Sequence, residues 1–562
     1  MEKQKITGSE AFLKALIAEG VDTIFGYPGG QAIPIYDSLY DYRDQLRHVL
    51  VRHEQGATHA AQGYARVSGK VGVTLVTSGP GATNTITGIA DALMDSTPMV
   101  VIAGQVPSPL LGTDAFQEVD VIGITQPITK WAYQIRKPEE IAWAVSRAFY
   151  IASTGRPGPV VLDLAKDAQV GLVDYEYKKV DYVRSYQPEP DIKKDRIKAA
   201  ADLINEAKKP FCLVGQGVLL GGAEEELKAF LQKNDIPAGS TVLGLSALPT
   251  DFPLNKGMLG MHGTKTSNLG VSECDLLIAV GVRFSDRVLG NAKKFAHHAK
   301  ILQFDVDAAE INKNIMVTNS VIGDLKKILA RINPMLSPME HKEWMEHIME
   351  YKKEYPLSYH PEGLSGPFVI EEIYRQTNGD AIMVTEVGQH QMWAAQYYKY
   401  KQPRTLLTSG GLGTMGYGLG AAIGAQIANP DKQVINIAGD GCFRMNMNEI
   451  ATAVRQKLPL IEVIINNHVL GMVRQWQTLF YEKHYSATVL DDGVDFVKLA
   501  EAMGATGYRA TSQAEFVDIL KKALASSTPV VIDCIIDSDD KVWPMVAPGA
   551  AISEVFTEED LK

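Results

Sequence analysis

One aspartate and one asparagine give the strongest chemical signal in the sequence. Asp440 stands between two glycines after the apolar run 433–438, and Asn467 lies just beyond the next run, 460–465. Because a strand–helix–strand crossover brings the carboxyl ends of both strands to one edge of a parallel sheet, we expect these side chains to lie close together. Carboxylate and amide oxygens suit Mg²⁺, and a helix N-terminus favours phosphate. The pattern predicts a site for a diphosphate bridged by Mg²⁺.

Each half of this pattern has a plainer interpretation. Gly-Asp-Gly alone is typical of a turn, and Asn-Asn alone is typical of an Asx turn at a strand end. The spacing and the strand–helix–strand context together favour the diphosphate site.

Gly-Asp-Gly, then 24 residues (442–465), then Asn-Asn resembles the signature of thiamine-diphosphate-dependent enzymes. The resemblance covers essentially the whole chain and is closest to the acetohydroxyacid (acetolactate) synthase catalytic subunits. It implies thiamine diphosphate and Mg²⁺ as cofactors, with the metal held by Asp440, Asn467 and the backbone of Val469. Cys442 stands where the family usually has Ser, and a thiol there can still pack and hydrogen-bond weakly.

Glu54 follows the apolar run 48–51 and opens a helical stretch, 54–67. The residues alone favour a first-turn glutamate that interacts with the helix dipole. The segment Arg-His-Glu-Gln-Gly, however, resembles the family's catalytic segment. A carboxylate beside the cofactor's aminopyrimidine promotes the tautomer that accepts a proton, so the resemblance implies that Glu54 is catalytic.

Four further residues match the family's substrate side. The resemblance implies an oxyanion-type role for the Gly30 loop, active-site wall positions for Phe116 and Gln117, and a substrate-channel role for Lys166. A plain turn and a solvated lysine are the alternatives for the first and last of these.

The third block of the chain carries the remaining cofactor contacts that the resemblance implies. Met415 matches the apolar wedge that bends the cofactor, although a Met in a Gly-rich segment is more often core filler. The full set is Gln389, His390, Gly413, Met415, Gly439, Asp440, Gly441, Asn467 and Met472.

The middle block resembles the flavin-binding segments of the same family. Its Gly215-Gln-Gly217 is weak evidence by itself, because the third glycine of a dinucleotide fingerprint is missing. The resemblance implies FAD in a structural role, since carboligation needs no net redox change. The implied FAD contacts are Arg156, Met261, His262, Arg283, Asp286, Arg287, Asp305 and Asp324.

Val473, Trp476 and Phe480 lie in a segment that resembles the family's mobile lid. Trp476 there narrows the pocket and is associated with 2-oxobutyrate as the second substrate. An amphipathic helix with a core Trp is the alternative.

Short apolar runs alternate with helical patterns along the chain, which indicates doubly wound parallel sheets. We expect an α/β protein with a pyrimidine-binding domain at 1–170, a central FAD-binding domain at 190–340, a diphosphate domain at 365–540 and a C-terminal tail at 541–562. Residues 170–196 read as a linker with a charged helix starting near 191, and a charged, Pro-containing stretch at 335–365 separates the last two domains.

Composition narrows the class of protein. The 562 residues carry a net charge of −11, which argues against a nucleic-acid binder. The apolar runs are far shorter than a membrane span and the first ten residues lack an apolar segment, so we expect neither a membrane protein nor a secretory signal. Four scattered cysteines fit a reducing cytoplasm.

The expected reaction is decarboxylation of pyruvate and its carboligation to a second 2-oxo acid. Pyruvate as acceptor gives 2-acetolactate and 2-oxobutyrate gives 2-aceto-2-hydroxybutyrate, both for branched-chain amino-acid synthesis. The resemblance implies a homodimer or homotetramer with shared active sites, and a small regulatory subunit is a possible further partner. A pyruvate oxidase or decarboxylase of the same fold, and a catalytically silent cofactor-binding homologue, are the alternatives.

Overall fold

The computed structural model describes residues 5–561; residues 1–4 and 562, at the outer ends of the predicted first domain and tail, lie outside it. Within the described residues the chain forms three six-stranded sheets and one antiparallel pair, β1 (Lys5–Thr7) with β8 (Leu172–Asp174). Every strand pairing inside the six-stranded sheets is parallel. The predicted fold class is confirmed.

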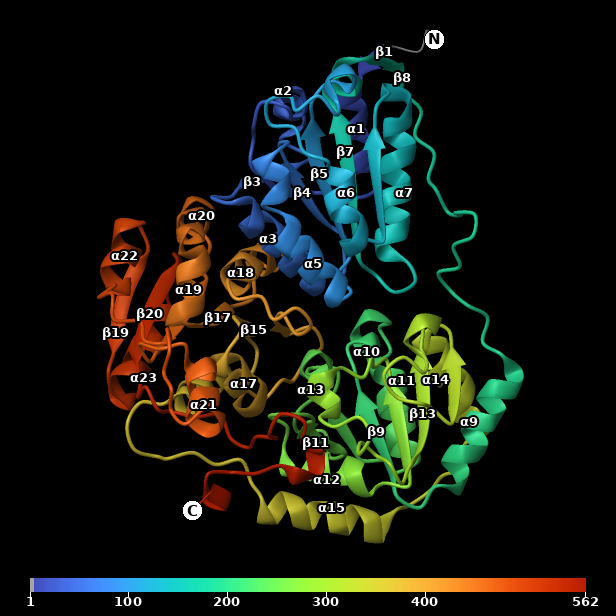
Figure 1. Ribbon diagram of the computed structural model, residues 1–562, viewed down its shortest axis with the longest axis vertical. Coiled ribbons are helices and arrows are strands. Elements are labelled where there is room, and N and C mark those ends of the chain that lie inside the picture. The colour runs from blue at the N-terminus through green and yellow to red at the C-terminus, as the bar shows by residue number, and fades with distance from the viewer. Residues whose placement is uncertain (1–4, 562) are drawn as a thin grey trace.

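The first sheet has the strand order β3-β2-β4-β5-β7-β6 and forms the upper part of the molecule in Figure 1. Its strands are β2 (Thr23–Gly26), β3 (Arg47–Leu50), β4 (Gly72–Val76), β5 (Met99–Gln105), β6 (Trp131–Ile135) and β7 (Pro159–Ala165). The helices that cover it include α1 (Gly8–Ala18), α2 (Ile33–Tyr42), α3 (Glu54–Ser68), α4 (Pro80–Thr83), α5 (Ile86–Met94), α6 (Val121–Thr125), α7 (Ile141–Ser153) and α8 (Lys166–Val170).

The second sheet has the order β11-β10-β9-β12-β13-β14. Its strands are β9 (Pro210–Val214), β10 (Ala238–Ser240), β11 (Asn255–Met258), β12 (Leu276–Val280), β13 (Lys300–Asp305) and β14 (Asn319–Ile322). The helices of this part are α9 (Lys194–Glu206), α10 (Gly217–Leu220), α11 (Glu224–Lys233), α12 (Lys265–Glu273), α13 (Asp286–Leu289), α14 (Leu325–Ile332) and α15 (Lys342–Glu354).

The third sheet has the order β16-β15-β17-β18-β20-β19. Its strands are β15 (Ile382–Thr385), β16 (Leu406–Leu407), β17 (Val434–Gly439), β18 (Ile461–Asn466), β19 (Thr506–Ala510) and β20 (Val530–Ile535). Its helices are α16 (Gly366–Thr377), α17 (Gln389–Tyr397), α18 (Gly418–Ala428), α19 (Asp440–Asn446), α20 (Ile450–Arg455), α21 (Gly471–Phe480), α22 (Phe496–Ala502) and α23 (Gln513–Leu524).

Two glycines join the first and third sheets through a close helix pair. A β-carbon on Gly63 of α3 would lie 2.0 Å from the carbonyl oxygen of Ala421, and one on Gly424 of α18 would lie 1.8 Å from that of Ala60. Only glycine permits backbones to approach this closely. Helices α3 and α18 therefore pack side by side and fix the two domains against each other (Figure 1).

The segments between the sheets differ in part from the sequence predictions. Residues 175–193 contain no helix or strand, and the charged helix begins at Lys194. The stretch 335–365 contains the helix α15, and Trp344 of that helix is buried against the middle domain. The C-terminal segment also lies on the middle domain, where Lys265 pairs with Asp560 at 2.9 Å.

None of the helices in residues 5–561 combines the length and the apolar character that crossing a membrane requires.

Candidate active site

Asp440 and Asn467 meet at one edge of the third sheet. Strands β17 and β18 are parallel neighbours, with Gly439 opposite Ile465, so the residues that follow each strand emerge together. Asp440 opens helix α19 and is buried, and one of its carboxylate oxygens has no hydrogen-bond partner among the described residues. The predicted juxtaposition follows from the strand order.

Burial raises the pKa of Asp440 to about 7, and the Arg444 charge and the backbone N–H groups of Asp440 and Gly441 offset only part of this shift. Among residues 5–561, no three His, Cys, Asp or Glu side chains converge as a metal cluster. A cation at Asp440 would therefore take its other ligands from amide, backbone and ligand oxygens. Mg²⁺, which is usually held by one or two carboxylates and phosphate oxygens, fits that donor set.

Asn467 belongs to a hydrogen-bonded turn. Its Nδ2 donates to Oε1 of Gln389 at 3.2 Å, and its Oδ1 accepts from the backbone N–H of Val469 at 3.2 Å. The Gln389 amide also donates to Oε1 of Gln475 and to the carbonyl of Asp540. This network places Gln389, Asn467 and Val469 together beside the N-terminus of α21.

His390 and Met415 flank the glycines around Asp440. The His390 ring lies 2.9 Å from where a β-carbon on Gly439 would stand, and Cε of Met415 lies 3.9 Å from the equivalent point on Gly441. Nε2 of His390 is buried and has no partner among the described residues. Burial lowers the pKa of His390 to about 3, so the ring is neutral at physiological pH.

Cys442, which replaces the usual Ser, is buried and its thiol donates to the carbonyl of Val387 at 3.0 Å. The thiol therefore makes a hydrogen bond to the segment that carries Gln389 and His390.

The glycine-rich loop that carries Met415 is held by buried carboxylates. Glu386 accepts from the N–H groups of Gly416 at 2.6 Å and Gly418 at 2.8 Å. Asp91, from helix α5 of the first domain, accepts from the hydroxyls of Ser409 and Thr414. The loop conformation thus depends on both domains.

Glu54 begins helix α3 at the edge of the first sheet. It is half-buried, and Nδ2 of Asn84 donates to its Oε2 at 2.9 Å. Nearby, Nζ of Lys166 donates to the carbonyl oxygen of Gly30 at 3.2 Å, which joins two predicted substrate-side residues.

Phe116 and Gln117 complete this group on the first domain. The Phe116 side chain is 84% exposed, and Gln117 has a left-handed backbone (φ 60°). The Gln117 backbone lies against Gly79, the residue before helix α4, and Asn84 follows the end of that helix. Gly30, Glu54, Phe116, Gln117 and Lys166 therefore surround one open face of the first domain.

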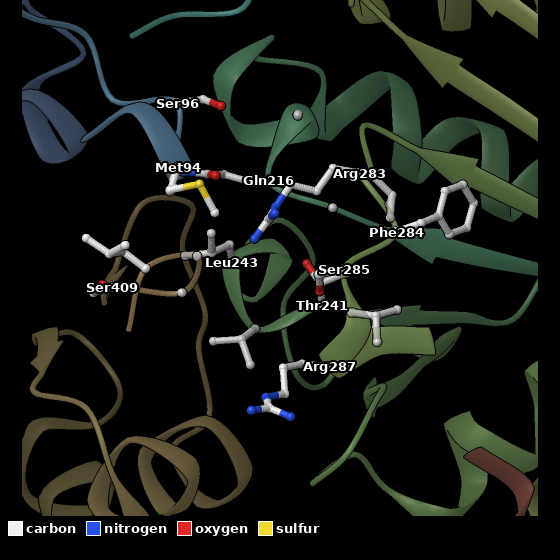
Figure 2. A pocket seen from close by; sticks show the side chains of 18 of the residues that line it. Met94, Ser96, Gln216, Thr241, Leu243, Arg283, Phe284, Ser285, Arg287 and Ser409 are labelled. Atoms are coloured by element: carbon white, nitrogen blue, oxygen red, sulfur yellow. The ribbon is translucent and has the colours of Figure 1, made fainter. Parts of the chain in front are cut away.

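The middle domain contributes to a cavity of about 1280 Å³ where all three domains meet. Figure 2 shows Arg283 and Arg287 directed into it from the middle domain, with Met94 and Ser96 of the first domain and Ser409 of the third on other walls. All eight residues predicted to contact FAD line it: Arg156, Met261, His262, Arg283, Asp286, Arg287, Asp305 and Asp324.

The cavity is lined by both arginine and aspartate side chains, which suit a ligand with a diphosphate and hydroxyl groups. Arg156 is held by Glu310 at 2.6 Å and donates to the hydroxyl of Ser96 at 2.8 Å. Burial raises the pKa of Asp305 to about 6, and Asp324 caps helix α14 by accepting from Lys327 N. Guanidinium groups suit phosphate oxygens and carboxylates suit ribose hydroxyls.

A third glycine of the middle domain, Gly281, follows strand β12 and packs against Gly217. A β-carbon on Gly281 or on Gly217 would lie 2.6 Å from the other glycine's α-carbon. Gly215, Gly217 and Gly281 all line the cavity. The sequence did not show that Gly281 meets Gly217, because a fingerprint is read from consecutive residues and this glycine follows a neighbouring strand.

The predicted lid forms helix α21. Met472, Val473 and Trp476 line the same cavity, as does Gly413 of the glycine-rich loop. The Trp476 ring packs on Phe480 at 5.8 Å, and the Arg287 guanidinium lies 5.8 Å from the Trp476 ring. Glu54 and Asp440 do not line this cavity, so it is separate from both side chains.

Three family profiles match the chain. They are described as the N-terminal TPP binding domain, the central domain and the C-terminal TPP binding domain of thiamine pyrophosphate enzymes, and they match residues 6–124, 197–332 and 386–534.

Curated relatives match almost the full length. An acetolactate synthase of Mycobacterium bovis is 46% identical over 566 residues, covering 98% of this chain and 91% of the relative. A probable acetolactate synthase large subunit of Methanocaldococcus jannaschii is 46% identical, covering 98% and 95%. The acetolactate synthase isozyme 2 large subunit of Escherichia coli K12 is 44% identical, covering 98% and 99%.

Three consecutive family matches in the order of the three sheets, together with near full-length identity of 44–46%, show that the chain belongs to the thiamine pyrophosphate enzymes and, within them, to the family of acetolactate synthase large subunits.

Proposed function

We propose that the chain joins pyruvate, with loss of CO₂, to a second 2-oxo acid in a thiamine-diphosphate-dependent reaction. The products are 2-acetolactate from pyruvate and 2-aceto-2-hydroxybutyrate from 2-oxobutyrate, in branched-chain amino-acid synthesis. The observation that carries the proposal is the pairing of Asp440 with Asn467 at the edge of a domain that matches the TPP binding family.

Asp440, Asn467 and the backbone of Val469 would hold Mg²⁺. The support is a buried carboxylate oxygen without a partner, an amide oxygen on the adjacent strand end, and a helix N-terminus. Gln389, His390, Gly413, Met415, Gly439, Gly441 and Met472 would surround the diphosphate and thiazolium.

Thiamine diphosphate, when bound, supplies a carbanion that attacks the carbonyl of a 2-oxo acid. Glu54 would exchange a proton with the aminopyrimidine, and its half-buried position beside Asn84 suits that task. Lys166 would bind the substrate carboxylate near the Gly30 loop, while Gln117 donates to a substrate oxygen and Phe116 excludes water.

The cavity at the junction of the domains would hold FAD in a structural role. Three guanidinium groups, three carboxylates and three closely spaced glycines fit its phosphates, ribose hydroxyls and close backbone approach. Trp476 and Val473, at one end of this cavity, would set the size of the second substrate.

We infer a homodimer or homotetramer in which the first domain of one chain completes the third domain of another. The open face of the first domain exposes Tyr27 (40%) and Phe116 (84%), and Leu412 (44%) and Met445 (55%) are exposed near Met415 and Asp440. Large apolar side chains in such positions are typical of contact surfaces. The relatives named as large subunits support a small regulatory subunit as a further partner.

All four cysteines are buried and free, which supports the proposed cytoplasmic location.

Incubation of the purified protein with pyruvate, thiamine diphosphate, Mg²⁺ and FAD tests the reaction. We expect 2-acetolactate without flavin reduction, and a mixed product when 2-oxobutyrate is added, both identified by mass. Acetaldehyde alone would indicate a decarboxylase, reduced flavin an oxidase, and bound cofactor without turnover a silent homologue.

A further inference from the structure

A glutamate of the third domain lies directly behind the segment that carries Glu54. Oε1 of Glu449 accepts from the backbone N–H groups of Arg52 and His53, each at 2.9 Å. Its Oε2 accepts from the hydroxyl of Thr452 at 2.6 Å, and the side chain is fully buried.

These contacts hold a corner of the chain that has no regular structure of its own. Strand β3 ends at Leu50 and helix α3 begins at Glu54, so the N–H groups of Arg52 and His53 belong to neither element. Glu449 supplies the acceptor for both N–H groups, so the corner depends on it. The orientation of Glu54, the next residue, depends on the same two hydrogen bonds.

The fit at this point is close. A β-carbon on Gly56 would lie 2.5 Å from Oε1 of Glu449. The first turn of α3 therefore packs so closely against the carboxylate that position 56 has no space for a side chain larger than that of glycine. A shift of either group would therefore move the other.

Glu449 also belongs to the segment that begins with the proposed metal ligand. Helix α19 starts at Asp440, and a 3-10 helix, Met447–Glu449, follows it. Glu449 stands nine positions after Asp440, so the stretch of chain that begins with the proposed metal ligand ends at the residue that supports the corner before Glu54.

We propose that Glu449 is a positioning residue for the catalytic glutamate: through the N–H groups of Arg52 and His53 it fixes Glu54 in its working orientation. The inference rests on the proposed function, because it takes Glu54 as the group that exchanges a proton with the cofactor. Glu449 acts through backbone hydrogen bonds and touches no reacting atom.

Two substitutions separate positioning from chemistry. Glu449→Ala removes the acceptor, whereas Glu449→Gln keeps an oxygen that can accept from the same two N–H groups. We expect Glu449→Ala to lower kcat about 10- to 100-fold and to change the KM for pyruvate and the cofactor affinity less than about threefold. The kcat of Glu449→Gln should stay within about threefold of that of the unmodified protein.

Hydrogen exchange of the full chain, without cofactor, gives a readout besides activity. The peptide that contains residues 50–56 is expected to lose protection at least tenfold in Glu449→Ala and to keep it in Glu449→Gln. The matched control is Glu372→Ala, which removes another buried carboxylate of the same domain, one whose partners are Arg375 and Gln376 on its own helix. It should change neither kcat nor the exchange of residues 50–56.

If Glu449→Ala does not fold, Gly56→Ala displaces the same contact and should reproduce the loss of kcat and of protection. Unmodified kcat or protection in the Ala variant, or a Gln variant as slow as the Ala variant, would overturn the inference. An unchanged turnover in Glu54→Gln would instead contradict the proposed function, whatever Glu449 does.

Discussion

The two predicted halves of the active site are built differently. In the third domain Asp440, Gln389, His390 and Asn467 are all buried. Gln389 and Asn467 are hydrogen-bonded to each other, and the His390 ring packs beside Gly439, the residue before Asp440. In the first domain Glu54 is half-buried, and the neighbouring Phe116 projects from an open face.

This difference indicates which half is complete within one chain. The diphosphate half has its polar groups in place before any ligand binds, and preorganised groups need no rearrangement on binding. The half that carries Glu54 is open where Phe116 is exposed, although Glu449 supports the segment before Glu54 through the N–H groups of Arg52 and His53. We therefore expect substitutions in the first domain to affect turnover and those in the third to affect cofactor binding.

The largest effect is expected from Glu54→Gln. Loss of the carboxylate should reduce kcat about 10²- to 10⁴-fold while thiamine diphosphate still binds, because the diphosphate half is untouched. Steady-state kinetics and a cofactor titration of the same preparation measure both quantities. Glu10→Gln is the matched control, since Glu10 is also a first-turn helix glutamate. Equal turnover in the two variants would show that Glu54 is not catalytic and only interacts with the helix dipole.

A smaller effect, on cofactor binding and not on turnover, is expected from Asp440→Asn. Replacing the charged ligand should weaken Mg²⁺-dependent cofactor binding by on the order of 10- to 100-fold, as expected for the loss of 1.5–3 kcal/mol at a charged group. Calorimetric titration of the cofactor at fixed Mg²⁺ measures it. Asp492→Asn removes an exposed carboxylate paired with Arg444 and should bind normally. Unchanged affinity in Asp440→Asn would place the metal elsewhere.

The smallest effect concerns Glu386, which supports the glycine-rich loop of the third domain. Burial raises its pKa from 4.5 to about 7, so between these values the folded chain holds a proton that the unfolded chain has lost. The free energy of unfolding should therefore fall as pH rises through this window, by on the order of 1 kcal/mol per pH unit from this group.

Glu386→Gln removes that contribution, so the stability of the variant relative to the unmodified protein should increase from pH 5 to pH 7. Denaturant unfolding without metal, at both pH values, measures the difference. Parallel pH dependence in the two proteins would show that Glu386 is ionised throughout.

The sequence predicted some interior strands and the edge strand β3, but not the interior strands β2 and β10. The run at 276–280 is continuously apolar, the run at 530–535 is apolar except for Asp533, and they form β12 and β20 with those bounds. The edge strands β6 and β19 escaped prediction, because Trp131–Ile135 and Thr506–Ala510 are only partly buried and mix polar with aromatic residues. Between β17 and β18, helices α19 and α20 are separated by a 3-10 turn ending at Glu449, whose carboxylate accepts hydrogen bonds from the first domain.

By itself, the sequence predicted the diphosphate site, because Asp440 follows one strand and Asn467 follows the next. The catalytic role predicted for Glu54 came from the family resemblance, since a glutamate at a helix start has a plainer explanation. Only the tertiary structure brought Gly281 beside Gly217, Asp91 to the loop of Met415, and Glu449 to the corner before Glu54. These partners are far apart along the chain, and no local pattern records which buried carboxylate will meet which unpaired N–H group once the domains pack.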